Sequence, residues 1–368
     1  MKRPSPPIHN PQSIYFIGIG GIGMSALARY FLQRGAAIYG YDKTASVLTK
    51  KLEDEGMIIH YTEDIDQVPK DIDLVIYTPA IPETHSELVY LKKQNLPLLK
   101  RAEVLGWISR QLKTIAVAGT HGKTTTSAIL THILRTGGID CTAFLGGIAQ
   151  NIGSNYIGGT SDWMVVEADE YDRSFLHLQP DMSIILSMDA DHLDIYGAHE
   201  EMKKTFAAFA QQLKEGGQLF VQADLPLQLY GQQSFGLEKG DYFAFNERIQ
   251  NGWSVFDFKS PMGSISDIRF AMPGRHNIVN ACAAISVALN LNISKNAIKE
   301  ALASFKGIKR RFERVFANEQ VVYIDDYAHH PTELKAAIDA ARQLFPQKKL
   351  TAIFQPHLYS RTRDFAVG

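Results

Sequence analysis

The sequence has few cysteines, no long hydrophobic run and almost no net charge, and each deficit argues against a class of protein. Its 368 residues include only two cysteines, which give no disulfide framework and no C-x-x-C metal site. No apolar run reaches membrane-spanning length, and no apolar signal segment follows Met1. The 38 basic residues nearly balance the 39 acidic ones, so nothing favours a nucleic acid or an anionic membrane as partner. We therefore expect a reduced, soluble, cytoplasmic protein; the sequence indicates no oligomeric state.

The length and the order of the elements predict an α/β fold with more than one domain. A chain of 368 residues exceeds one ordinary hydrophobic core, and strand-like and helix-like segments alternate nearly throughout. Strands are expected at 13–17, 37–41, 73–77, 162–167, 182–188, 321–325 and 349–354, and helices at 24–34, 101–112, 125–135, 277–291 and 332–344. Breaks near 110 and 310 predict domains at 1–109, 110–310 and 311–368. The last segment holds one strand–helix–strand unit, which is too small for a full domain of this class.

The most informative segment is Gly119-Thr-His-Gly-Lys-Thr-Thr125, which follows an apolar strand and precedes a helical pattern. In such a turn, backbone N–H groups and a helix N-terminus surround a phosphate. The ammonium group of Lys123 then reaches the outer phosphates, and the hydroxyl of Thr124 is available to Mg²⁺. Val117 stands where such loops usually have their first glycine, and Gly119 supplies the turn instead. The segment predicts a nucleoside triphosphate site formed by Gly119, Thr120, His121, Gly122, Lys123, Thr124 and Thr125.

A second glycine cluster, Gly18-Ile-Gly-Gly-Ile-Gly23, follows the first strand, with Asp42 about 20 residues further on. This pattern fits a pyrophosphate-binding fingerprint, but alone it does not separate NAD, FAD and a UDP-sugar. The separate triphosphate loop favours an ATP-driven enzyme that acts on a nucleotide-linked substrate. An NAD-dependent oxidoreductase leaves the loop of Lys123 unexplained. A third hypothesis is a nucleotide-gated switch, whose loop binds ATP without forming an amide.

Acidic clusters at 167–172 and 189–194 follow two expected strands and therefore meet beside the phosphate loop. Carboxylates suit the Mg²⁺ that accompanies ATP, so one or more of these residues are expected to bind metal. His192 is an unusual Mg²⁺ ligand, and its chemistry alone favours a hydrogen-bonded loop histidine. Asn277 opens a helical pattern, for which capping is the default explanation. Arg361 and Arg363 lie just past an expected strand, which suits an anion site.

Taken together, these motifs resemble the Mur ligases of peptidoglycan synthesis. The matching segments follow the family order over nearly the whole chain: Gly18-Ile-Gly-Gly-Ile-Gly-Met24, Gly119-Thr-His-Gly-Lys-Thr-Thr125, Glu167-Ala-Asp-Glu170, Asp191-His-Leu-Asp194, Gly274-Arg-His-Asn277, Arg310-Arg-Phe312, Asp326-Tyr-Ala-His-His-Pro331 and Gln355-Pro-His357. The resemblance implies a Rossmann-like N-terminal domain for a UDP substrate and a central P-loop ATPase-like domain. It also implies a C-terminal Rossmann-like domain that closes over the amino acid and that is incomplete in this chain.

The resemblance also implies a role for each matching residue. Lys123 and Thr124 are expected at the ATP phosphates and a first Mg²⁺, whereas Glu167 and His192 are expected to hold a second Mg²⁺. The expected adenosine contacts are Asn277 and His329. The expected contacts of the UDP-linked substrate are Gly20, Gly21, Gly23, Met24 and Ser25, together with the fingerprint residue Asp42. Tyr327, Arg361 and Arg363 are expected near the carboxylate and amino-acid end of the reaction, and the expected catalytic set is Lys123, Glu167, His192 and Arg361.

Within the family, two positions bear on the substrate. Phe206 stands where the ligases that add later residues carry a modified lysine, which favours the branch that joins L-alanine to UDP-N-acetylmuramate. Tyr171 replaces a common serine and is familiar from the branch that recycles muropeptides by joining a tripeptide to the same UDP-sugar. The glycine cluster at 18–23 departs from that second branch, so the recycling reaction ranks as the alternative.

Overall fold

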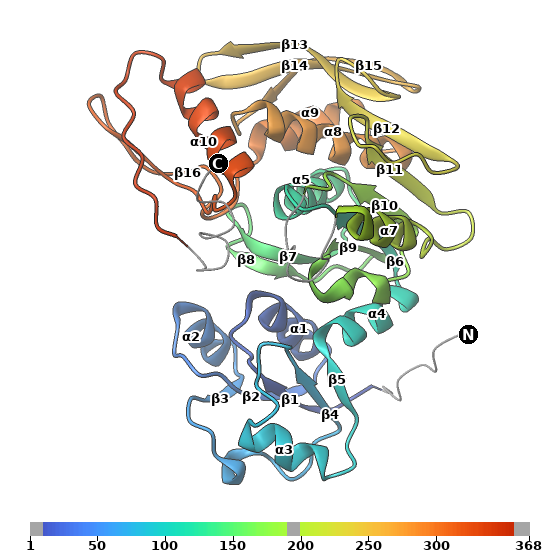
Figure 1. The fold of residues 1–368 in the computed structure, drawn as a ribbon, viewed down its shortest axis with the longest axis vertical. Helices are drawn as coiled ribbons and strands as arrows, with labels where there is room; N and C mark the ends of the chain where they lie inside the picture. Colours follow the sequence, from blue (N-terminus) through green and yellow to red (C-terminus); the bar gives the residue numbers. More distant parts are fainter. Residues whose placement is uncertain (1–9, 190–198, 357–368) are drawn as a thin grey trace.

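The computed structural model describes residues 10–189 and 199–356. Figure 1 shows a small sheet with its helices at one end of the molecule and a larger sheet with its helices above it. The segment that contains β16 and α10 lies beside the larger sheet. The predicted α/β class is confirmed. No helix among the described residues is both long and apolar enough to span a membrane.

The first sheet is five-stranded and parallel, with the order β3-β2-β1-β4-β5. Its strands are β1 (Ser13–Ile17), β2 (Ala37–Tyr41), β3 (Ile58–His60), β4 (Leu74–Tyr77) and β5 (Leu98–Lys100). Its helices are α1 (Ile22–Gln33), α2 (Val47–Asp54) and α3 (Ser86–Lys92), with the 3₁₀ turn η1 (Ile65–Gln67). Since the strand order reverses at β1, the carboxyl ends of β1 and β4 border a crevice of the kind that binds nucleotides.

The second sheet has ten strands in the order β15-β14-β13-β12-β11-β10-β6-β9-β7-β8. Its strands are β6 (Lys113–Ala118), β7 (Thr142–Ala149), β8 (Ser154–Ile157), β9 (Trp163–Ala168), β10 (Met182–Ile185), β11 (Gln218–Gln222), β12 (Gln232–Leu237), β13 (Tyr242–Gln250), β14 (Trp253–Ser260) and β15 (Gly263–Phe270). The stretch from β13 to β7 is parallel, whereas β14, β15 and β8 pair antiparallel. The alternation of strands and helices did not predict these antiparallel strands, because hairpin strands lack an intervening helix.

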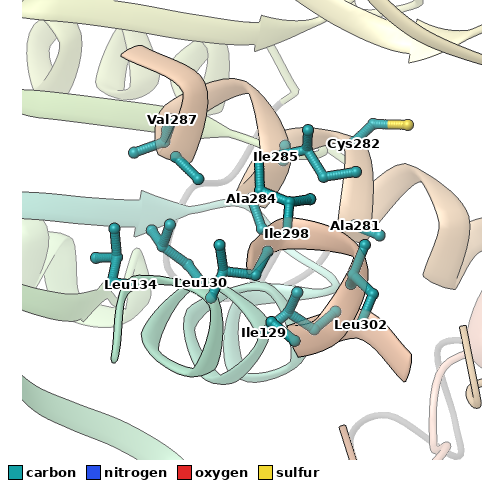
Figure 2. Packing of buried hydrophobic residues seen from close by; sticks show 14 of the residues in the cluster. Ile129, Leu130, Leu134, Ala281, Cys282, Ala284, Ile285, Val287, Ile298 and Leu302 are labelled. Atoms are coloured by element: carbon teal, nitrogen blue, oxygen red, sulfur yellow. The ribbon is translucent and has the colours of Figure 1, made fainter. Parts of the chain in front are cut away.

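Helices cover both faces of the larger sheet. They are α4 (Arg101–Gln111), α5 (Lys123–Thr136), α7 (His199–Ala210), α8 (Arg275–Asn290) and α9 (Lys295–Ser304), with the 3₁₀ segment η2 (Tyr171–His177). Figure 2 shows the apolar face of α5 meeting α8 and α9 through side chains such as Leu130, Ile285 and Leu302, all fully buried. The cysteines Cys141 and Cys282 are free thiols buried in this core. Burial raises the pKa of Cys141 to about 12 and raises that of Cys282 as well, so both thiols stay protonated.

The first sheet and the larger sheet share one hydrophobic cluster, to which Leu27 of α1, Phe144 of β7 and Val166 of β9 contribute. A buried polar contact joins the same two parts, because the Nη1 atom of Arg29 donates to the side-chain oxygen of Asn155 at 2.6 Å. The guanidinium also forms a bidentate ion pair with Glu55. The two parts are therefore joined through a common core.

The last described segment contains β16 (Glu313–Ala317), β17 (Val322–Asp325) and α10 (Pro331–Leu344), with the two strands paired antiparallel. The strand predicted at 349–354 is wrong: these residues carry no regular secondary structure, and Ile353 is 96% exposed. Its apolar residues suggested a buried strand, but no neighbouring strand among the described residues offers a ladder for it. The predicted helix at 332–344 is confirmed and starts one residue earlier, at Pro331.

Candidate functional site

The phosphate loop lies between β6 and α5, at the carboxyl edge of the larger sheet. Its last residue, Gly122, has a φ of 82° and is the N-cap of α5. A Cβ at this position would lie 2.5 Å from the side-chain oxygen of Asn280 on α8, so only glycine fits. On the other side of the loop, the backbone N–H of His121 donates to the hydroxyl of Ser187 at 2.8 Å. The loop is thus held between α8 and the chain that follows β10, with the positive end of α5 behind it.

Lys123 is the first residue of α5, two residues earlier than the predicted start of this helix. Its ammonium group donates to the carbonyl of Gly119 at 2.6 Å and to both carboxylate oxygens of Glu170, at 2.7 and 3.0 Å. Burial alone would lower the pKa of Lys123, but the carboxylates of Glu170 and Asp169 outweigh it and raise the pKa. The ammonium is therefore charged, and Glu170 holds it where a phosphate would otherwise be its counterion.

Thr124 and Glu167 lie side by side next to Lys123. The hydroxyl of Thr124 donates to Glu167 at 3.1 Å, and the backbone N–H of Gly146 donates to the other carboxylate oxygen. Burial raises the pKa of Glu167 despite these hydrogen bonds and the nearby cation. A half-buried carboxylate beside a hydroxyl is the oxygen-rich donor set that Mg²⁺ prefers, so these two predicted ligands fit the ion.

The metal prediction rests on those two residues. Across residues 10–189 and 199–356, no group of three or more histidine, cysteine, aspartate or glutamate side chains is arranged as a metal site. His192, the third predicted ligand, lies outside the described residues, as do Arg361 and Arg363. Their predicted roles stay predictions.

A cavity of about 290 Å³ opens beside the phosphate loop, between α8 and α10. Its lining includes the predicted residues Thr120, His121, Gly122, Lys123, Thr124, Thr125 and Asn277. Asn277 lies in the first turn of α8, where its amide donates to the carbonyl of Pro273 at 2.7 Å. His276, which the sequence reasoning did not single out, also lines the cavity, and burial lowers its pKa to about 4. A neutral imidazole there is suited to contact an uncharged nucleoside rather than a phosphate.

His329, the other residue expected at the adenosine, lies next to this cavity but does not line it. The Nδ1 atom of its ring donates to the carbonyl of Tyr327, 2.7 Å away, and its backbone N–H donates to Glu333. Tyr327 lines neither this cavity nor the one beside the front glycine loop, and its ring lies 4.8 Å from the guanidinium of Arg310. The arginines predicted to bind the amino acid lie outside the described residues, so the expected position of Tyr327 near the amino acid stays a prediction.

An ion-paired histidine connects the phosphate loop to the C-terminal segment. The two ring nitrogens of His121 lie 3.1 Å from Asp189 and 3.1 Å from Glu333 of α10. Burial works against a charged ring, but the two carboxylates prevail and raise the pKa of His121 to about 9. Burial likewise opposes the charge on Glu333, yet His121, Arg311 and His329 lower its pKa to about 2. Sequence reasoning missed Glu333, because an acid in the first turn of a helix is already explained by the helix dipole.

The front glycine loop joins β1 to α1. The backbone N–H of Gly20 donates to the carboxylate of Asp42 at 2.7 Å, which brings together two of the predicted substrate residues. Ser25 is fully buried, and its hydroxyl accepts from the amide of Asn155 at 3.0 Å. Ser25 thus faces the central part of the molecule, while Gly21, Gly23 and Met24 line a cavity.

This second cavity, of about 360 Å³, runs from the front glycine loop to the phosphate loop. Besides the start of α1, its lining includes Arg101, Lys123, Glu167 and Asp169. Lys123 therefore lines both cavities, the one between α8 and α10 and the one beside the front glycine loop. Two ligands bound in these cavities would meet at its ammonium group.

Phe206, the residue at the position of the modified lysine, is fully buried on α7. Its ring meets that of Phe175 edge-on at 5.4 Å, and Phe209 stacks on Phe175 at 4.7 Å. An aromatic cluster therefore occupies this place, with no room for a solvated or modified lysine. Nothing is described of the side chain of Tyr171, so its meaning for the substrate stays a prediction.

Family models match three successive stretches of the chain. One described as "Mur ligase family, catalytic domain" matches residues 13–113, one described as "Mur ligase middle domain" matches 117–288, and one described as "Mur ligase, glutamate ligase domain" matches 310–367. Curated relatives align over nearly the whole chain. The UDP-N-acetylmuramate–L-alanine ligase of Flavobacterium psychrophilum is 52% identical over 363 residues, which are 98% of this chain and 80% of that protein. The enzyme of the same name from Porphyromonas gingivalis is 45% identical over 96% of this chain and 80% of its own length.

Solved structures of related ligases also superpose on this chain. The UDP-N-acetylmuramate–alanine ligase MurC from Thermotoga maritima superposes with a TM-score of 0.85 at 31% identity, over 94% of this chain and 81% of that one. A murein peptide ligase from Psychrobacter arcticus superposes with a TM-score of 0.76 at 26% identity, over 94% of this chain and 79% of that one.

Proposed function

The chain belongs to the Mur ligase family, and from that premise we propose that it joins L-alanine to the muramyl carboxylate of UDP-N-acetylmuramate. It is an ATP-dependent, amide-bond-forming ligase of peptidoglycan precursor synthesis. The observation that carries the proposal is the position of Lys123 on the lining of both cavities. A nucleotide in one cavity and a UDP-linked acid in the other would bring a γ-phosphate and a carboxylate to the same ammonium group.

Amide formation from a carboxylate needs activation, because oxide is a poor leaving group. In the proposed first step, a carboxylate oxygen attacks the γ-phosphorus of ATP, the bond to the β-phosphate oxygen breaks, and ADP leaves. The chain supplies positioning and positive charge rather than a covalent intermediate. The ammonium of Lys123 and the N-terminus of α5 stabilise the charge on the transferred phosphoryl group.

In the second step, the free amine of alanine attacks the acyl carbon and inorganic phosphate leaves. The acyl phosphate must be shielded from water until the amine arrives, since water would hydrolyse it. The contact of Glu333 with His121 places α10 over the phosphate loop and closes one side of the nucleotide cavity. Arg361 and Arg363, whose side chains are not described, are proposed to bind the amino acid.

Mg²⁺ belongs to the proposal through Thr124 and Glu167, whose oxygen atoms fit it, with His192 as a further ligand on family resemblance. When bound, the ion would neutralise phosphate charge. We further propose that residues 1–109 bind the UDP-substrate, 110–310 bind ATP, and 311–368 begin the closing domain. A cytoplasmic location is part of the same proposal and agrees with the two free thiols.

Phosphate release tests the function directly. The protein is mixed with ATP, Mg²⁺, UDP-N-acetylmuramate and L-alanine, and release is measured with each component omitted in turn. We expect release only when both the sugar nucleotide and alanine are present. Release indifferent to both would contradict the ligase and favour a nucleotide-gated switch. A change in absorbance with NAD and a hydroxy acid would favour an oxidoreductase.

The amino component separates the two branches of the family. The similarity to a murein peptide ligase and the presence of Tyr171 favour a tripeptide as the alternative partner of the same sugar nucleotide. L-alanine and the tripeptide L-alanyl-γ-D-glutamyl-meso-diaminopimelate are therefore compared at equal concentration. We expect alanine to give the higher kcat/KM, and a higher value for the tripeptide would reverse the assignment.

A further inference from the structure

Arg101 lines the cavity of the front glycine loop and has no role in the family resemblance. It is the first residue of α4, directly after β5, and α4 contacts both α1 and η2. The start of this helix is fixed, because the carboxylate of Glu103 accepts the backbone N–H of Lys100 at 2.8 Å and Val104 is fully buried. The backbone of Arg101 is therefore held in place, and its side chain lines the cavity of the front glycine loop.

The guanidinium of Arg101 lies against the first turn of α1. A Cβ built on Gly23 would stand 2.9 Å from its Nη1 atom and 3.1 Å from its Cδ atom. Gly23 is the second helical residue of α1, so the guanidinium lies beside the N–H groups that have no acceptor within the helix. The absence of a side chain at position 23 is what allows this close approach.

The electrostatics of this arrangement call for an anion. The N-terminus of a helix carries a partial positive charge, and a guanidinium beside it adds a full one. Asp169, whose carboxylate lies 3.5 Å from the Nη2 atom of Arg101, balances part of this charge from the central domain. Both side chains are partly exposed, so this ion pair contributes little to stability and is readily exchanged for a stronger anionic partner.

The other cation near this place is engaged elsewhere. Among the described residues that line the cavity, the basic side chains are Arg101 and Lys123. Lys123 belongs to the phosphate loop and is held by Glu170 at 2.7 Å. The front glycine loop itself offers backbone N–H groups but no basic side chain. A diphosphate on this loop would therefore have Arg101 as its counter-charge.

We propose that Arg101 binds the diphosphate of the UDP-linked substrate across the N-terminus of α1. Its planar fork of N–H donors matches two phosphate oxygens, as a bidentate arginine–phosphate pair requires. On substrate binding, the guanidinium exchanges the carboxylate of Asp169 for the diphosphate. This inference rests on the proposed function, because that function places a UDP-linked substrate in this cavity.

Calorimetric titration tests the proposal with UDP, UDP-N-acetylmuramate and a non-hydrolysable ATP analogue as ligands. Arg101→Met keeps an unbranched stem and removes the charged guanidinium, so we expect the Kd for UDP and for UDP-N-acetylmuramate to rise by about tenfold to a hundredfold. Arg101→Lys keeps the charge but not the fork and should give an intermediate loss. Arg110→Met, on the exposed last turn of the same helix, is the matched control and should bind as the wild type does.

Each outcome decides one point. Unchanged binding of the ATP analogue shows that the variants are folded, and in turnover we expect a raised KM for the sugar nucleotide with kcat within about threefold of the wild type. Equal affinities of Arg101→Met and wild type for UDP would overturn the proposal. A loss seen only with UDP-N-acetylmuramate would also overturn it, since Arg101 would then bind the muramyl carboxylate. If the wild type itself does not bind UDP or its sugar derivative, the proposed function fails instead.

Discussion

Glu333→Gln should loosen α10 from the phosphate loop while leaving the central core intact. The carboxylate of Glu333 contacts His121 at 3.1 Å and lies 3.8 Å from Arg311, and its side chain is 15% exposed. A glutamine keeps the size and one hydrogen-bond acceptor but removes the charge that both neighbours face. The variant therefore isolates the electrostatic part of the contact between the C-terminal segment and the loop.

The magnitude follows from the pKa of Glu333. The pKa falls from an ordinary 4.5 to about 2, and each pKa unit corresponds to about 1.4 kcal/mol, so the native environment favours the ionised form by at most about 3.5 kcal/mol. His121, Arg311 and His329 share this stabilisation. We expect Glu333→Gln to lower the local stability of α10 by roughly 2 kcal/mol, which is about a thirtyfold rise in its open fraction.

The stability of the contact between α10 and the phosphate loop depends on pH in a definite direction. The raised pKa of His121, about 9 against an ordinary 6.5, gives stability that is complete below pH 6.5 and is lost as the pH rises through 9. The lowered pKa of Glu333 gives stability that is complete above pH 4.5 and is lost as the pH falls through 2. The contact of α10 with the loop is therefore strongest between about pH 4.5 and 6.5 and weakens toward pH 9.

Amide hydrogen exchange read by mass spectrometry measures this opening. Peptides from α10 should exchange about thirtyfold faster in Glu333→Gln, and peptides from α8 should be unchanged. Asp339→Asn is the matched control on the same helix, because Asp339 forms an exposed pair with Lys335 that contributes at most about 0.5 kcal/mol. Equal exchange of α10 in Glu333→Gln and wild type, or no weakening between pH 6.5 and 9, would refute the reasoning.

Three further predictions concern the phosphate loop and the core. Lys123→Ala should lower phosphate release by roughly a hundredfold or more while UDP binding persists, and near-native turnover would rule out its role at the transferred phosphoryl group. Gly122→Ala should abolish binding of the ATP analogue, since its Cβ would meet Asn280 at 2.5 Å; calorimetry showing wild-type affinity would contradict this close approach. Leu130→Ala should lower the free energy of unfolding in urea by about 2–5 kcal/mol, whereas Val47→Ala, at a 79% exposed position, should change it by less than about 0.5 kcal/mol.

The sequence predicts the parts of the site that depend on local geometry. A strand, a glycine turn and a helix N-terminus are consecutive in the chain, so the phosphate loop and its lysine are recognisable without a structure. The position of Glu167 and Asp189 at the carboxyl edge of the sheet also follows from the sequence, because Glu167 lies at the end of one parallel strand and Asp189 comes just after another.

The remaining contacts depend on residues far apart in the chain. Glu333 is 212 positions from His121, and its sequence context gives no sign of that pairing. Arg101 reads as an ordinary basic residue at the start of a helix until the approach to Gly23 is seen. The predicted strand at 349–354 fails for the related reason that a strand needs a neighbour, which periodicity does not supply. The antiparallel strands β14 and β15 were not predicted, because the expected alternation requires a helix after every strand.

The hydrophobic core that the five-stranded and ten-stranded sheets share has a consequence for the order of events in the proposed reaction. Arg29 and Asn155 fasten α1 to the sheet that carries the phosphate loop, so the separation between the two phosphate-binding turns is set by the scaffold before any ligand arrives. The C-terminal segment contacts the loop through the carboxylate of Glu333 on α10, an ionic contact that a change of ligand can rearrange. We therefore expect this fixed frame to align the acid and the nucleotide, and we expect the C-terminal segment, whose contact with the loop is ionic, to control admission of the amine.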